Sequence, residues 1–101
     1  MSDEKIKVQV DEDLEDLIPG FLENRNTDVN KLKTALDSGN FADLTSIGHS
    51  LKGVGGGYGF DQMSELGAAI ESAAKAEDAD TVRDKINLLE DYLQRVEIEY
   101  V

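Results

Sequence analysis

The chain has 101 residues, one histidine and no cysteine, and 22 acidic against 10 basic side chains give it a formal net charge of −12. This length suits a single domain, and the negative charge argues against binding to nucleic acid or to anionic membrane surfaces. Without cysteine there can be no disulfide, thiol nucleophile or cysteine-based zinc site. The sequence contains no apolar run long enough to span a bilayer, and its N-terminus lacks the layout of a signal peptide, so we expect a cytoplasmic protein.

The two ends of the chain alternate apolar and polar residues, which is typical of short strands. The alternation covers residues 6–10 and 96–100, so the two ends could lie side by side. Residues 11–18 are acidic and then apolar, which predicts a short helix with an acidic first turn. Pro19 suits the first turn of the next helix, where a backbone N–H is not needed.

Apolar residues then recur every three or four positions in four longer segments, which predicts four amphipathic helices. Gly39 can end the first of them and Asn40 can cap the second, while Asp61 can cap the third and Asp78 or Asp80 the fourth. A run of glycines from residue 55 ends or loosens the second helix. The expected inward positions are Leu22, Val29, Leu32 and Leu36, with Phe21 and Ala35 beside them; Leu44, Ile47, Leu51 and Val54; Met63, Leu66, Ile70 and Ala73 or Ala74; and Val82, Ile86, Leu89, Leu93 and Val96.

These segments and their short joins predict an all-α fold, an antiparallel four-helix bundle with a short additional N-terminal helix. We divide the chain into an N-terminal arm at residues 1–10, one bundle domain at residues 11–96 and a C-terminal tail at residues 97–101. We expect a monomer.

The single histidine lies on the outward face of the second long helix. At about 100° per residue, the apolar stripe around Ile47 spans roughly 80°, and His49 lies almost opposite to it. A lone surface histidine is usually incidental, but Gly53, one turn later, is costly inside a helix, by about 1 kcal/mol relative to Ala. The absence of a side chain at this position would let a docking partner reach the imidazole. The other outward residues of this helix are Thr45, Ser46, Lys52 and Gly56.

Lys52 lies three residues after His49, so the two side chains are neighbours on one helix face. Two basic groups side by side suit an anion better than a metal ion, and we expect no metal site. An imidazole nitrogen can accept a phosphoryl group, and an ammonium can offset the charge of phosphoryl oxygens. The simpler alternative is that Lys52 only balances nearby acidic residues.

The residues His49-Ser50-Leu51-Lys52-Gly53, followed by Gly59, form the pattern His-x-x-Lys-Gly-x5-Gly. This pattern closely resembles that of the histidine-containing phosphotransfer (HPt) domains of two-component phosphorelays, and the resemblance extends from about residue 14 to residue 96. It implies that the imidazole Nε2 of His49 carries a phosphoryl group between aspartates of receiver domains.

The resemblance also implies roles for other residues. Lys52 would help to neutralise the phosphoryl group, Gly53 would leave room for the receiver, and Gly59 would shape the turn after the helix. Glu71 matches a position where the family often places Gln or Glu, so it could hydrogen-bond the histidine ring, although a solvated helix residue is an equal alternative. We group Thr45, Ser46, Gly53, Gly56 and Glu71 as expected partner-binding residues.

The resemblance implies a phosphoryl carrier that is not an enzyme, with receiver domains of response regulators or hybrid histidine kinases as partners. The sequence has no nucleotide-binding glycine motif, so we expect no self-phosphorylation from ATP. We expect no cofactor of the chain's own, because the Mg²⁺ for transfer would come from the receiver. The alternative is a helical adaptor that binds a signalling partner through the same face without transfer. A hydrolase is disfavoured, because no nucleophile or metal constellation accompanies the lone histidine.

Overall fold

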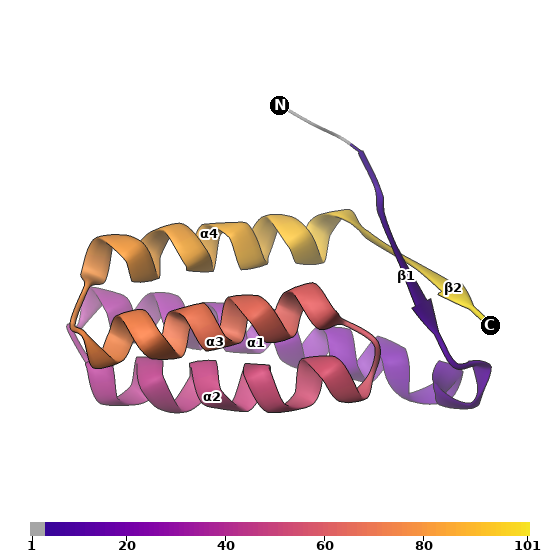
Figure 1. Cartoon of the computed structure of the whole chain (residues 1–101), viewed down its shortest axis with the longest axis horizontal. Coiled ribbons are helices and arrows are strands. Elements are labelled where there is room, and N and C mark those ends of the chain that lie inside the picture. The colour runs from indigo at the N-terminus through magenta and orange to yellow at the C-terminus, as the bar shows by residue number, and fades with distance from the viewer. Residues whose placement is uncertain (1–3) are drawn as a thin grey trace.

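A computed structural model describes residues 4–101, so the first three residues of the predicted N-terminal arm lie outside the described residues. Four helices pack side by side as a bundle, and a small pair of strands crosses one end of it (Figure 1). The elements, in chain order, are β1 (Ile6–Val10), the 3₁₀ helix η1 (Glu12–Leu17), α1 (Ile18–Asp37), α2 (Phe41–Gly57), α3 (Asp61–Lys75), α4 (Ala79–Arg95) and β2 (Val96–Tyr100). The prediction of an all-α bundle with a short additional N-terminal helix is confirmed, with a two-stranded sheet added to it.

Side-chain caps fix where most of these helices begin. The side chains of Asp11, Asn40 and Asp78 accept hydrogen bonds from backbone N–H groups in the first turns of η1, α2 and α4. Between the two candidates for α4, Asp78 is therefore the cap. The prediction for Asp61 is wrong, because Phe60 precedes α3 as its cap residue and Asp61 is the first helical residue. Phe60 is fully buried, so packing rather than a polar cap defines this helix start.

The core follows the predicted apolar stripes closely but not completely. All the inward positions predicted for α3 are buried, whereas six of the other predicted inward positions are only half-buried: Leu22, Leu36, Ile47, Val54, Leu93 and Val96. On α2 the positions closest to the core are Leu44 and Leu51 together with two glycines, and the helix continues through the glycine run to Gly57. Tyr92 is buried on α4, and sequence analysis missed it as a core residue.

The two chain ends pair as a parallel two-stranded sheet, in the register Ile6↔Val96 to Val10↔Tyr100. Parallel strands need a long crossover connection, and here the entire bundle supplies it. Val8 and Val10 extend the core beneath this end of the molecule. The side-by-side arrangement of the ends that the alternating patterns allowed is thus confirmed.

The helices run alternately up and down, and α2 and α3 lie next to each other along the lower side of the bundle in Figure 1. Within residues 4–101, no helix combines the length and the apolar character that crossing a bilayer requires.

Candidate functional site

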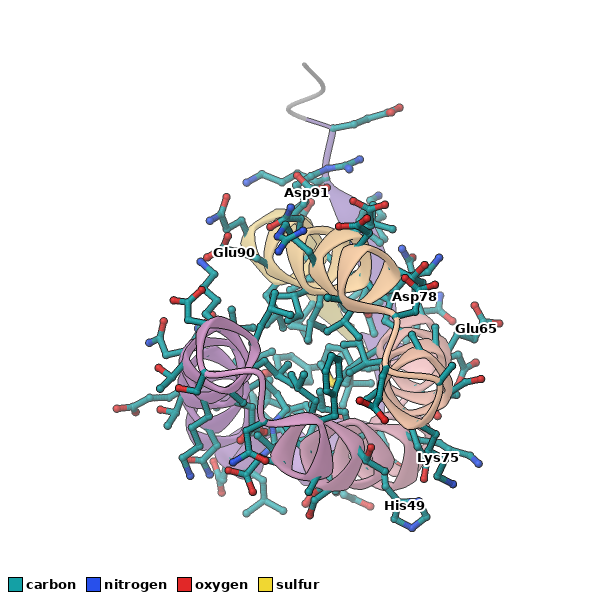
Figure 2. The ribbon with its side chains drawn as sticks, turned by 90° about the vertical axis from the view of Figure 1, so that its left-hand side faces the viewer. His49, Glu65, Lys75, Asp78, Glu90 and Asp91 are labelled. Carbon is teal, nitrogen blue, oxygen red and sulfur yellow. The ribbon has the colours of Figure 1, made fainter. Side chains whose placement is uncertain are left out.

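The candidate site lies on the outer surface where α2 and α3 run side by side. His49 projects away from the bundle at this edge, as Figure 2 shows, and 70% of its side chain is exposed. Lys52, Gly53 and Gly56 follow on the same helix and are also exposed. A large partner can therefore reach the imidazole from solvent without any rearrangement of the core.

Glu71 of α3 contacts the imidazole directly. Its Oε2 atom lies 2.8 Å from Nδ1 of His49, and its side chain is only 13% exposed. An ionised carboxylate can only accept hydrogen bonds, so Nδ1 must carry the proton that is donated. In the neutral ring, Nε2 then has no proton and keeps its lone pair. The contact with Glu71 thereby fixes the orientation of the ring and leaves Nε2 as the ring nitrogen with an available lone pair.

Two lysines lie on either side of the same carboxylate. The ammonium nitrogen of Lys52 is 3.9 Å from Oε1 of Glu71, and that of Lys75 is 3.6 Å from Oε2. Partial burial acts to raise the pKa of Glu71, but the hydrogen bond from His49 and the charges of Lys75, His49 and Lys52 outweigh it and hold the pKa below its ordinary value of 4.5. Glu71 is therefore ionised at neutral pH, and it holds two cations beside the imidazole.

The other expected site residues differ in what surrounds them. A Cβ atom added at Gly53 or at Gly56 would meet nothing within 4 Å, so no packing within the chain requires glycine at either position. Ser46 is exposed, and the hydroxyl of Thr45 donates to the carbonyl of Phe41 within its own helix, at 2.8 Å. The structure thus brings His49, Lys52 and Glu71 together, and the surface at Gly53 and Gly56 is free of other side chains within 4 Å of an added Cβ.

Gly59 lies in the turn between α2 and α3. Its φ of +88° is in a region that side-chain-bearing residues rarely adopt, and an added Cβ would lie 2.9 Å from the carbonyl oxygen of Gln9 in β1. Both the turn and the approach of β1 therefore require glycine here.

Comparison with protein-family models identifies the family of this chain. A family model described as the Hpt domain matches residues 10–99, which is nearly the whole chain. The chain belongs to the Hpt domain family. No curated protein and no solved structure gives a significant match to it. Hpt domains are helical bundles that carry phosphoryl groups in two-component signalling, interact with receiver domains and lack kinase activity.

Two features of this Hpt domain were missed by sequence analysis. The first is Lys75, whose ammonium group lies next to Glu71; the spacing of the two residues, four apart on one helix, was a usable signal. The second is a pair of buried glycines between α2 and α3, Gly48 and Gly67. For Gly48 the helical angle gave a signal, because it lies about 100° from Ile47, next to the buried stripe.

Among residues 4–101, no group of three or more acidic or histidine side chains is arranged to hold a metal ion.

The lowered pKa of Glu71 leads to a testable dependence of stability on pH. A carboxyl group whose folded-state pKa is depressed stabilises the fold above its unfolded pKa and loses that contribution as the pH falls through the folded value. We expect Glu71→Gln to lower the free energy of unfolding at neutral pH and to match the original protein once the pH is well below 4.5. Urea unfolding over a series of pH values measures this difference, and a difference that did not change with pH would contradict the assigned ion pairs.

Proposed function

We propose that the protein accepts a phosphoryl group on Nε2 of His49 from the aspartyl phosphate of one receiver domain and passes it to the aspartate of another. The observation that carries this proposal is the 2.8 Å contact between Nδ1 of His49 and Glu71 on a side chain that is 70% exposed. That contact leaves the Nε2 lone pair directed at solvent, where a receiver can bring its aspartyl phosphate.

The proposed step balances without any further reactant. The Nε2 lone pair attacks phosphorus and forms the N–P bond, while the P–O bond to the aspartate breaks and the carboxylate leaves with its electron pair. The proton on Nδ1 stays in place, so the phosphorylated ring becomes positively charged. The ionised Glu71 next to Nδ1 offsets that charge, and the reverse step regenerates the neutral ring.

Two cations are available for the phosphoryl oxygens. The flexible side chain of Lys52 lies on the same helix face as His49, and we assign it the role of offsetting their charge. Lys75 adds a second positive charge at the same edge. We further propose that the receiver supplies the Mg²⁺ for transfer, and that Gly53 and Gly56 leave the space into which the receiver docks.

Transfer from a phosphorylated receiver tests this function against that of an adaptor that only binds. Receivers of the source organism are charged with acetyl phosphate and Mg²⁺ and then mixed with the protein. We expect at least one of them to label it with an acid-labile, base-stable phosphate. An adaptor would bind a receiver and remain unlabelled with every receiver in the panel, and this result would rule out the carrier function.

A further inference from the structure

The backbones of α2 and α3 come unusually close at one point beneath the candidate site. A Cβ atom added at Gly67 would lie 2.6 Å from the backbone nitrogen of Lys52 and 2.8 Å from the carbonyl oxygen of Gly48. A Cβ atom added at Gly48 would in turn lie 2.9 Å from the carbonyl oxygen of Gly67. We call this reciprocal contact the glycine crossing (Gly48 and Gly67).

The glycine crossing lies directly under the residues of the site. Besides Gly67, the Cβ atom added at Gly48 would meet the backbone nitrogen of Glu71 at 2.8 Å. These neighbours are backbone atoms that cannot rotate away, so an alanine at either glycine must push the two helices apart by several tenths of an ångström. That displacement separates the helix that carries His49 from the helix that carries Glu71.

A side-chain hydrogen bond fixes the two helices at the same level. The hydroxyl of Ser64 on α3 donates to the backbone carbonyl of Lys52 on α2, at 2.6 Å. A third close approach, where a Cβ at Gly55 would lie 2.7 Å from the nitrogen of Ser64, stands beside it. Sliding and separation of the helices are therefore both restricted next to Lys52.

We propose that Gly48, Gly67 and Ser64 are positioning residues, which hold α2 and α3 at the separation that lets Glu71 fix the protonation of the His49 ring. This inference rests on the proposed function, since it concerns the nitrogen that accepts the phosphoryl group. The close approach makes the 2.8 Å hydrogen bond to Nδ1 possible, and the bond keeps the proton off Nε2. A wider separation frees the ring to place its proton on Nε2, and in that form Nε2 has no lone pair with which to attack phosphorus.

The ring nitrogens of His49 report this effect directly. Nitrogen NMR shifts of the unphosphorylated, ¹⁵N-labelled protein distinguish the two neutral forms of the ring, and His49 is the only histidine in the sequence. We expect only the Nδ1–H form in the original protein and a substantial Nε2–H population in Gly67→Ala and Gly48→Ala. Gly57→Ala is the matched control, because a Cβ there meets nothing within 4 Å and the ring should remain in the Nδ1–H form.

The rate of transfer from a phosphorylated receiver completes the experiment. Displacing α2 from α3 by several tenths of an ångström should slow transfer by about 10- to 100-fold in both Gly67→Ala and Gly48→Ala. The inference would be overturned if Gly67→Ala and Gly48→Ala fold and their His49 rings remain in the Nδ1–H form. If circular dichroism shows that neither variant folds, Ser64→Ala decides, because it removes one hydrogen bond and adds no atoms. The Nε2–H form must appear there too, or the inference fails. The NMR readout needs neither phosphate nor receiver, so its result is independent of whether the protein proves to be a carrier.

Discussion

His49→Gln will abolish labelling by a phosphorylated receiver. Removal of a covalent nucleophile leaves no second group to take its place, so we expect a loss of at least about 10⁴-fold, which is below detection in a labelling assay. The side chain of His49 is 70% exposed, so the fold should persist, with a change in unfolding free energy within about 0.5 kcal/mol. The glutamine amide can still donate a hydrogen bond to Glu71.

Labelling on a gel and thermal unfolding by circular dichroism measure the two halves of this prediction. Ser50→Ala is the matched control, since Ser50 is the exposed residue next to His49 and no role is assigned to it. It should be labelled at the original rate. A His49→Gln protein that still took up phosphate from the receiver would show that another residue carries the group.

Gly53→Arg will block transfer from a receiver while the bundle stays folded. Gly53 is exposed and an added Cβ would meet nothing within 4 Å, so a side chain can start here without a clash at its Cβ. A helical side chain covers the turn that precedes its own Cα, which here is the turn that carries His49. We expect at least about a 100-fold loss of transfer, the scale expected when reacting groups are held out of position. Replacing an exposed helical glycine should stabilise the fold slightly, by up to about 1 kcal/mol.

Two controls separate exclusion of the partner from loss of reactivity. Asn87→Arg adds the same charge on α4, on the opposite side of the bundle from α2, and should transfer at the original rate. Phosphoramidate is a small phosphoryl donor that needs no docking surface, so it should still label His49 in the Gly53→Arg protein. Unchanged transfer from the receiver to the Gly53→Arg protein would contradict the proposal that the receiver docks over Gly53.

The positions of the helices were predictable because local signals agreed with one another. Asn40 and Asp78 cap helices, Gly39 has a φ of +66° after the end of α1, and Pro19 lies in the first turn of that helix. Asp61 misled the prediction because an acidic residue in a first helical turn and a cap residue look alike in sequence. The burial of Phe60, which fixes the start of α3, depends on tertiary packing against Phe21, 5.2 Å away between ring centroids.

The outward face of α2 could be derived from helical geometry alone, and His49, Lys52 and Gly53 are exposed on it. What geometry within one helix could not supply is the contact across to α3. The meeting of His49 with Glu71 depends on the separation of two helices, which in turn depends on buried glycines at positions 48 and 67. Helical geometry places Gly53 on the outward face, but it does not show how closely the backbone of another helix approaches a buried glycine such as Gly67.

The central claim is that Nε2 of His49 carries the phosphoryl group, and NMR of the phosphorylated protein tests it most directly. The protein is labelled with ¹⁵N on its histidine ring, charged by a phosphorylated receiver, and examined for coupling between ³¹P and the ring nitrogens. We predict a single phosphorus signal coupled to Nε2 of His49, with the proton still on Nδ1 next to Glu71. Coupling to Nδ1, or a phosphorus signal with no coupling to the histidine ring, would contradict the account.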